Sequence, residues 1–324
     1  ISKLAVIMPA RLGDFSDPER LRGLIEFLTD GGRLNDRFEN FVLHNVSTWI
    51  LAGKFPKRNV RIFGYPATEP YYVFLVEESK YQFPHLQVRT PSGGHNRALL
   101  KAGLSAIIDK MNPDLEKHGQ LLLEVDTTVR AMFLELQSEG AAFETVYAHG
   151  KFIPFFIDKE QKKKLLEMEF TAPEGFKIDT IDVPNEYELI YSMWPFRALS
   201  TPEPLRTRLE ELPSSCVRAE DGSLVAWDTI TTFGQLTHLF TLEPYRDKGL
   251  GVLAGNILSQ VLARNGLHVY KYIVDTNVDV VRGTMKHPLW SRWRSVKNGK
   301  EPDEDNEDIL WSFNLFKYIR AKDN

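Results

Sequence analysis

Apolar residues recur along the chain with two different spacings, and the succession of the two predicts a mixed α/β protein. Apolar residues and threonines alternate with other residues over 234–242, which predicts a strand. Apolar residues then recur at helical spacing from Gly249 onward, and Asn265-Gly266 can end that helix. A second strand is expected over 269–274. The second half therefore contains a strand, a loop, a helix and a strand in succession.

The first half shows the same two spacings. The expected elements are helices over 21–28, 41–51 and 95–109 and strands over 59–64, 71–76 and 121–125. The first two strands are expected to pair around a turn that contains Pro66 and Pro70. Near the end of the chain, residues 290–296 and 309–319 are expected to form a hairpin around an acidic loop, 301–308.

The order of expected elements repeats. Helix, strand, turn and strand occur in both halves, and Val125-Asp-Thr-Thr-Val129 is similar to Val274-Asp-Thr-Asn-Val278. We therefore expect two tandem copies of one α/β fold, one over residues 1–170 and one over residues 171–324. The charged segment 158–169, a helix followed by Pro173 and Gly175, is the expected linker.

A basic, glycine-containing loop follows the strand over 234–242. Arg246 and Lys248 lie in this loop, and Gly249, Gly251 and Gly255 follow in the first turns of the helix. Each glycine costs about 1 kcal/mol relative to alanine in a helix, so helix propensity does not explain them. Free amides at a helix N-terminus bind anions, and glycine lets an anion approach the backbone. The loop predicts a phosphate site, although a tight turn that needs small residues gives the same pattern.

A dinucleotide-binding fold is one alternative for this unit. Gly249-Leu-Gly251 fits the glycine fingerprint of that fold, and Asp275 ends the next strand where a ribose-binding acid is expected. However, several charged residues and Pro244 separate the strand from the first glycine. Few residues remain after Asp275 to complete a doubly wound sheet, so this alternative is the weaker one.

The segment Arg246-Asp-Lys-Gly-Leu-Gly251 resembles the coenzyme A signature of the GNAT acyltransferase superfamily. Within it, short runs in the same order between 174 and 295 are similar to the glycine N-acyltransferase family, among them Gly222 to Asp228 and Thr241 to Arg246. The resemblance implies a GNAT fold with a mixed sheet, acyl-CoA as co-substrate and a small amine, such as an amino acid, as acceptor. It also implies coenzyme A contacts from Phe240, Thr241, Leu242, Arg246, Asp247, Lys248, Gly249, Leu250, Gly251, Val252 and Asn277.

The chain departs from this family at two positions that matter for catalysis. Gln235 stands where glycine N-acyltransferases have a glutamate as general base, and Met285 stands where many GNAT proteins have an acidic tyrosine. His238, on the same strand, is the nearest titratable substitute for the base. Strand alternation places it opposite Gln235 unless a bulge intervenes, and a packed structural histidine is the alternative. A coenzyme A-binding protein without catalysis is therefore a second hypothesis, and a dinucleotide binder is the third.

The first copy lacks the features of a cofactor site. Thr128 stands at the position of Asn277, and Arg89 to Gly94 stands at the position of the Arg246 loop without its spacing. We expect this copy to be degenerate, to bind no cofactor and to form one wall of an acceptor cleft between the two halves.

Composition excludes other classes of function. The net charge of −4 gives no general attraction to nucleic acid or to anionic membranes, and no apolar run reaches the ~18 residues of a membrane span. The single cysteine, Cys216, excludes an internal disulfide and is expected to be a small buried residue. The eight histidines form no metal-binding pair, so no metal is expected. We expect a cytoplasmic monomer or homodimer, with mitochondria as the alternative location.

Overall fold

A computed structural model of the chain gives the fold. The structure describes residues 11–30, 38–53, 59–79, 82–90, 95–140, 143–195, 197–199, 201–293 and 311–319. The expected acidic loop 301–308 and most of the 89–94 segment lie outside these residues.

The first half alternates strands and helices. Its elements are β1 (Gly13–Asp14), α1 (Pro18–Asp30), α2 (Phe38–Leu51), β2 (Asn59–Tyr65), β3 (Tyr72–Ser79), β4 (Gln82–Arg89), α3 (Arg97–His118), β5 (Gln120–Asp126), α4 (Thr127–Ser138), β6 (Phe143–Phe156) and α5 (Lys159–Glu167).

The second half repeats this order of elements in part. Its elements are β7 (Phe176–Asp179), α6 (Val183–Ser192), the 3-10 helix η1 (Arg197–Leu199), α7 (Glu203–Glu211), β8 (Ser215–Ala219), β9 (Leu224–Ile230), β10 (Leu236–Thr241), the 3-10 helix η2 (Glu243–Tyr245), α8 (Leu250–Arg264), β11 (Tyr270–Val274), α9 (Val278–Lys286), β12 (Ser291–Arg292) and β13 (Trp311–Tyr318).

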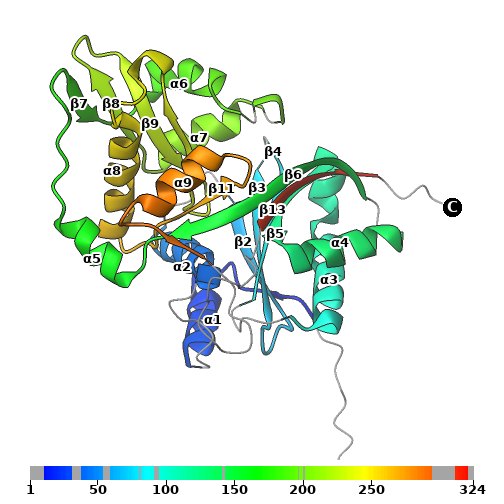
Figure 1. Cartoon of the computed structure of the whole chain (residues 1–324). Helices are drawn as coiled ribbons and strands as arrows, with labels where there is room; N and C mark the ends of the chain where they lie inside the picture. Colours follow the sequence, from blue (N-terminus) through cyan, green and yellow to red (C-terminus); the bar gives the residue numbers. More distant parts are fainter. Residues whose placement is uncertain are drawn as a thin grey trace, which may run out of the picture.

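One mixed sheet runs through both halves in the order β1-β2-β3-β4-β5-β13-β6-β11-β10-β9-β8-β7. The long strand β6 crosses the molecule from one half to the other (Figure 1). Its first part pairs with β13, and its last part, Phe152 to Phe156, pairs with β11. Strand β13, which follows β12 in the described part of the chain, lies between β5 and β6 and so completes the sheet of the first half.

Each half contains one parallel strand pair joined by a helix. Strands β4 and β5 are parallel and joined by α3, and strands β10 and β11 are parallel and joined by α8. A further helix, α4 or α9, follows the second strand of each pair. The expected repeat of the element order is therefore present. The boundary near residue 170 stays a prediction, because the sheet is continuous across it.

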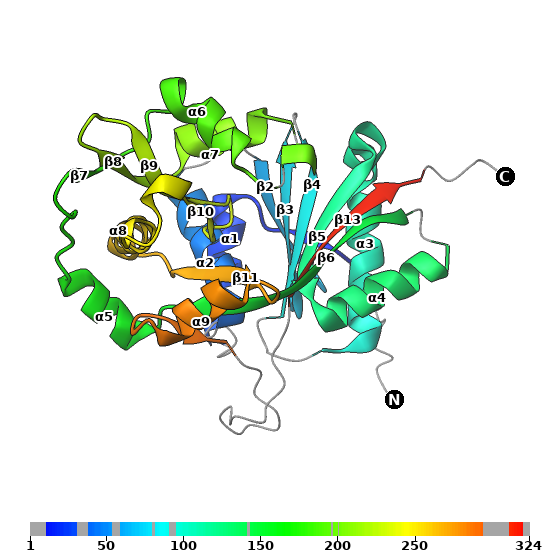
Figure 2. The ribbon, with the colours of Figure 1, turned by 45° about the horizontal axis from the view of Figure 1, so that its top comes forward.

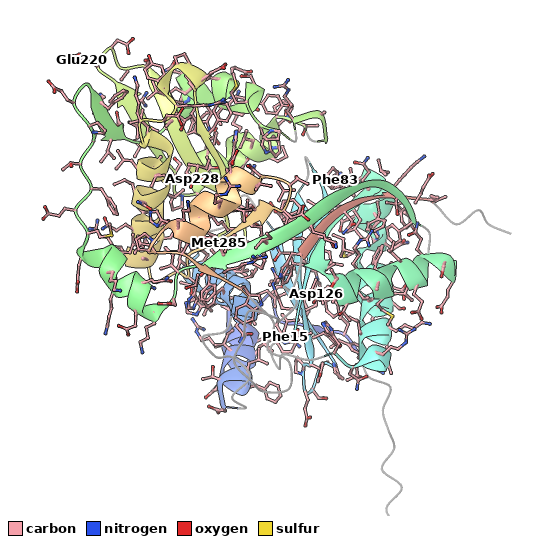
Figure 3. All side chains as sticks on the ribbon, in the orientation of Figure 1. Phe15, Phe83, Asp126, Glu220, Asp228 and Met285 are labelled. Atoms are coloured by element: carbon pink, nitrogen blue, oxygen red, sulfur yellow. The ribbon has the colours of Figure 1, made fainter. Side chains whose placement is uncertain are left out.

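The helices form layers on the sheet. Helices α3 and α4 cover the face of the first-half sheet that points away from the second half (Figure 2). Helix α2 bridges the halves, since Asn45 Nδ2 donates to the His268 carbonyl and the Phe41 and His268 rings stack at 4.0 Å. Helices α6 and α7 pack on one face of β8 and β9, and α8 packs on the other. Side chains fill the spaces between these layers (Figure 3).

Local capping explains several helix ends. Asp158 and Gln161 form a capping box at the start of α5, which matches the expected helix in the 158–169 segment. Asn96 accepts from the Leu99 amide at the start of α3, and Gly119 ends that helix with a φ of 68°. Helix α3 is therefore longer than the expected 95–109, and it continues through Pro113.

Most of the other expected elements are present. The helices over 21–28 and 41–51 correspond to α1 and α2, and the two expected strands around Pro66 pair as β2 and β3. The expected C-terminal hairpin is wrong as a pairing. Strands β12 and β13 both pair with β6, and among the residues that the structure describes they do not pair with each other.

Candidate functional site

Strands β10 and β11 diverge and leave a slot between them. Their parallel register is defined at Leu236 and Lys271. Beyond this point, β10 pairs with β9 through a bulge between Thr237 and Phe240, and β11 pairs with β6. A slot between two parallel strands exposes backbone amides and carbonyls that a ladder would otherwise pair.

The N-terminus of α8 lies at one end of this slot. Gly249 is the N-cap with a φ of 74°, a conformation that glycine adopts at little cost, and no side chain caps the helix there. The amides of Leu250, Gly251 and Val252 are the first of the helix and have no intrahelical acceptor. A helix N-terminus of this kind favours an anion.

The other two glycines also have a packing role. A Cβ at Gly251 would lie 2.8 Å from Thr241 Oγ1, and a Cβ at Gly255 would lie 3.5 Å from Asp228 Oδ2. Both glycines therefore let α8 approach β9 and β10. A Cβ at Gly249 would meet nothing within 4 Å, so Gly249 alone faces open space at the expected phosphate position.

The basic residues of the loop differ in their placement. Arg246 Nε donates to the Thr241 carbonyl at 3.3 Å, and the guanidinium lies 5.9 Å from the Phe240 ring centroid. Lys248 Nζ lies 5.6 Å from the Phe176 ring and 5.5 Å from the Tyr245 ring. Arg246 thus faces the slot, whereas Lys248 lies among aromatic rings beside it.

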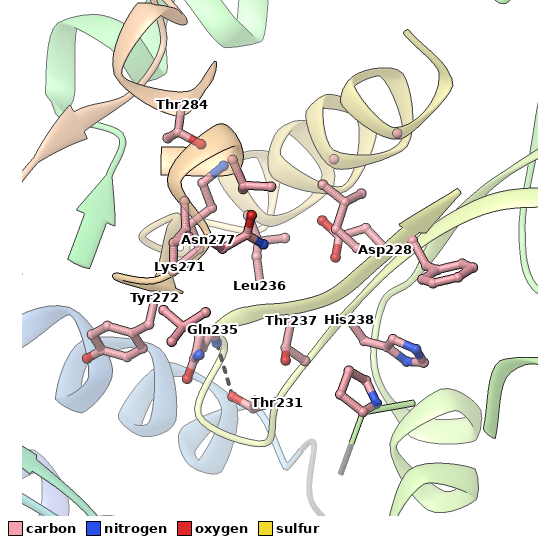
Figure 4. Close-up of a pocket in the computed structure, with 18 of the residues that line it drawn as sticks. Asp228, Thr231, Gln235, Leu236, Thr237, His238, Lys271, Tyr272, Asn277 and Thr284 are labelled. Atoms are coloured by element: carbon pink, nitrogen blue, oxygen red, sulfur yellow. Dashed lines mark hydrogen bonds between the residues drawn. The ribbon is translucent and has the colours of Figure 1, made fainter. Parts of the chain in front are cut away.

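One cavity of about 1050 Å³ contains most of the expected coenzyme A residues (Figure 4). Of the expected set, its lining includes Phe240, Thr241, Arg246, Asp247, Gly249, Leu250, Gly251, Val252 and Asn277, and it does not include Leu242 or Lys248. The Leu242 amide instead donates to the Val225 carbonyl. Residues of the first half, Glu77, His85 and Glu124, also line the cavity, so both halves enclose it.

The bulge in β10 decides where His238 points. His238 has a φ of 60° and lies edge-on to Trp227 with ring centroids 5.9 Å apart. The bulge therefore brings His238 to the same face of the strand as Gln235 and Thr237 (Figure 4). Without the bulge, regular strand alternation would have placed His238 on the opposite face. Burial, together with the nearby charge of Arg208, lowers the pKa of His238 to about 4. His238 is neutral at pH 7 and a weak base, which favours the packing interpretation.

Gln235 is buried in the turn between β9 and β10. Its backbone amide donates to Thr231 Oγ1 at 3.3 Å, and its carbonyl accepts from the Thr231 amide. The side-chain oxygen Oε1 is buried, and no donor reaches it among the described residues. An amide cannot accept a proton from an amine, but this oxygen can accept a hydrogen bond from one.

An acid and a base that sequence reasoning did not select lie in the same cavity. Asp228 on β9 and Lys271 on β11 lie on the α8 side of the sheet, on either side of Leu236 (Figure 4). Burial raises the pKa of Asp228 to about 8 and lowers the pKa of Lys271 to about 8. Lys271 Nζ also lies 4.1 Å from the Trp290 ring centroid. An aspartate within a continuously buried strand was the available signal.

A second polar cluster comes from the first half. Glu77 on β3, His85 on β4 and Glu124 on β5 are buried and line the cavity. His85 Nε2 lies 3.1 Å from Glu124 Oε2, which also accepts from Gln87 Nε2 at 2.8 Å. Each of the three lies on a different strand, and polar residues on a strand are typical of a face exposed to solvent, so the sequence did not single them out.

Two residues at the far side of the slot complete the expected set. Asn277 is the N-cap of α9, and its amide donates to the Val274 carbonyl. Met285 on α9 is half exposed and does not line the cavity (Figure 3). No acid for a leaving thiolate therefore comes from this position.

Cys216 is buried, and burial raises the pKa of its thiol to about 12, in line with a packing role.

The chain matches no family-level sequence profile. It is 25% identical to human glycine N-acyltransferase over 155 residues, 43% of this chain and 52% of that protein. It is 29% identical to a mouse glycine N-acyltransferase-like protein over 129 residues, 37% of this chain and 43% of that protein. The chain therefore aligns with about half the length of these curated relatives.

Solved structures cover more of the chain. A Drosophila protein superposes with a TM-score of 0.70 at 15% identity over 96% of this chain and 99% of its own. A tandem GNAT protein from the clavulanic acid biosynthesis pathway superposes with a TM-score of 0.52 at 12% identity, covering 97% of this chain and 99% of its own. The chain has the GNAT fold and is similar in sequence to glycine N-acyltransferases over part of its length. In this fold, the diverging strands β10 and β11 and the N-terminus of α8 belong to one strand–helix–strand unit.

Two further findings concern the described residues of this protein. Among them, no helix has both the length and the apolar character needed to cross a membrane. Within the same residues, no three histidine, cysteine or acidic side chains gather as metal ligands would.

Proposed function

We propose that this GNAT protein transfers an acyl group from coenzyme A to the amine of a small molecule. One observation supports this proposal most: the slot between β10 and β11 and the uncapped N-terminus of α8 open into the same cavity. The names of the curated relatives, glycine N-acyltransferases, suggest an amino acid as the acceptor.

The donor would lie along the slot. Its diphosphate would accept from the amides of Leu250, Gly251 and Val252, with Arg246 adding positive charge. The pantetheine and acyl chain would pass Leu239, Val252 and Val280, apolar cavity residues that are 45%, 53% and 43% exposed. Apolar side chains exposed to this extent around one slot are typical of a ligand site.

The reaction itself needs little covalent help from the protein. The amine nitrogen forms a bond to the thioester carbonyl carbon, the carbon–sulfur bond breaks, and the amine loses a proton. Amides released from the ladder by the bulge at Thr237 to Phe240 would stabilise the oxyanion of the tetrahedral intermediate. Positioning of the two substrates supplies the remaining acceleration.

A thiol-release assay tests this function. Acyl-CoAs of several chain lengths are incubated with the protein and a panel of small amines, including amino acids. We expect free thiol to appear only when both an acyl-CoA and a matching amine are present. If coenzyme A raises the thermal stability of the protein but no thiol is released, the result would instead support the non-catalytic alternative. The low pKa of His238 and the absence of a glutamate at position 235 favour that alternative. Stabilisation by NAD alone would contradict both.

A matched pair of glycines tests the binding geometry. Gly249 and Gly266 lie at opposite ends of α8, both have positive φ, 74° and 79°, and a Cβ at either meets nothing within 4 Å. Alanine at either position therefore costs a similar strain of about 1 kcal/mol. We expect Gly249→Ala to weaken coenzyme A binding at least tenfold and Gly266→Ala to leave it unchanged, by calorimetry. Equal affinities for the two variants would refute the placement of the diphosphate.

A further inference from the structure

The first half holds a carboxylate against the turn that carries Gln235. Thr232 Oγ1, in the turn between β9 and β10, donates to Glu77 Oε1 at 2.8 Å. Glu77 comes from β3, and both it and Gln235 line the cavity. A carboxylate is therefore fixed close to the position where related enzymes are expected to have one, but it comes from the other half of the chain.

The surroundings of Glu77 form a connected polar wall. Glu77 Oε2 lies 3.9 Å from His85 Nδ1, and His85 Nε2 lies 3.1 Å from Glu124 Oε2. The His85 ring also lies edge-on to Phe233, in the same turn as Thr232, with ring centroids 4.8 Å apart. Contacts from this turn thus hold both Glu77 and His85.

The charge of this wall suits a cation. Its two carboxylates flank one imidazole, and the guanidinium of Arg89 lies 3.9 Å from Glu124 Oε1, whereas the other oxygen of that carboxylate contacts His85. The turn beside this wall offers the buried Gln235 Oε1, which no donor reaches among the described residues. A primary ammonium or amine supplies the N–H groups that such acceptors need.

We propose that the wall formed by Glu77, His85 and Glu124 is the subsite for the acceptor amine, and that Glu77 takes its proton. This proposal rests on the proposed acyl transfer. The acceptor would enter as a primary ammonium, donate to Glu77 and to Gln235 Oε1, and transfer one proton to Glu77. The neutral amine then attacks the thioester carbonyl, its second proton passes to solvent, and the thiolate leaves and is protonated by solvent. His85 lies between Glu77 and Glu124 and positions Glu77.

A charge-exchange experiment tests the assignment. Glu77→Gln keeps an acceptor for Thr232 and replaces the basic carboxylate by a neutral amide of nearly the same shape, so we expect the fold to be retained. We expect this variant to lose kcat at least about a hundredfold with the KM for acyl-CoA unchanged, and to lose the acid limb of the pH–rate profile. Adding Gln235→Glu places a carboxylate on the same turn. The double variant should regain at least tenfold of the lost kcat.

The neighbouring Glu78 provides a matched control. It follows Glu77 on β3, but its Oε1 lies 3.6 Å from Arg61 Nη1 and it does not line the cavity. Glu78→Gln should retain kcat and the pH profile of the unmodified protein. Glu77→Asp, which keeps the charge but withdraws it by one methylene, serves as the second variant and should show an intermediate kcat.

The outcomes separate this proposal from the proposed function. Thiol release by the Glu77→Gln variant within twofold of the unmodified protein, with the same pH profile, would overturn the role of Glu77. If the unmodified protein releases no thiol with any amine, the proposed function fails. The subsite is then tested by thermal stabilisation of the coenzyme A complex with the amine panel. Stabilisation that Glu77→Gln abolishes supports the subsite, and stabilisation that is absent or unaffected by this change overturns it.

Discussion

The close approach of α8 to β10 can be tested through Gly251. A Cβ at this position would lie 2.8 Å from Thr241 Oγ1 and 3.9 Å from Leu239 Cδ1. Real Cβ atoms are not found as close to a neighbour as the first distance, whereas the second is an ordinary van der Waals contact. Gly251→Ala therefore has two opposing effects on the free energy of unfolding: a gain in helix propensity and a steric conflict with one identified atom.

The two effects differ in magnitude. Alanine in place of a helical glycine stabilises by about 1 kcal/mol. Overpacking of a closely packed contact costs about 1–3 kcal/mol. We expect Gly251→Ala to lower the free energy of unfolding by about 1 kcal/mol. In a Thr241→Ala background, which removes the conflicting oxygen, the same change should raise it by about 1 kcal/mol, so the two sites couple by about 2 kcal/mol.

Urea denaturation of the four proteins in this cycle measures the coupling. Gly23→Ala is the control, because Gly23 lies within α1 and a Cβ there meets nothing within 4 Å. It should stabilise the unmodified protein and the Thr241→Ala variant by the same amount. Additive effects of the Gly251 and Thr241 changes would refute the steric argument, and would return Gly251 to a role in anion binding alone.

Two more predictions follow from burial in the second half. The pKa of His238 falls from 6.5 to about 4 in the folded protein, so the stability that this histidine contributes is fully present above pH 6.5 and is lost as the pH falls toward 4. Urea denaturation should show a loss of up to about 3 kcal/mol over this range, reduced in His238→Gln, and an unchanged loss in that variant would count against the shift. Cys216 is buried with its pKa raised to about 12, so a thiol reagent at pH 8 should label the native protein far more slowly than the urea-unfolded protein, and equal rates would contradict this placement.

The sequence predicted those elements of the second half whose formation depends on the spacing of residues close together in the chain. The strand, basic loop and helix from 234 to 265 depend on residues close together in the chain, and the structure has β10, the loop and α8 there. The bulge at His238 was only an open alternative, because a one-residue register shift depends on the partner strand β9.

The sequence predicted the contribution of the first half poorly. Strands β4 and β6 were not expected, and β6 contains Gly150 and Pro154, residues that normally argue against a long strand. The polar residues Glu77, His85 and Glu124 come from three strands and meet only in the folded sheet. Their burial depends on the second half covering that face, which no local pattern encodes.

The glycines illustrate a subtler limit. The sequence indicated that Gly249, Gly251 and Gly255 serve a purpose worth their cost in helix propensity. Their separate roles, open space at Gly249 and helix–strand contact at Gly251 and Gly255, became distinguishable only from the neighbouring atoms. Glycines in one motif can therefore be required for different physical reasons.

The position of β13 has a consequence for how this protein is made. Because Trp311 to Tyr318 (β13) lie between β5 and β6, the sheet of the first half lacks one strand until β13 leaves the ribosome. Nascent chains that stop before this strand would display two unpaired edges, which are prone to join with other chains. The first half can therefore complete its sheet only after the second half has been translated as far as β13.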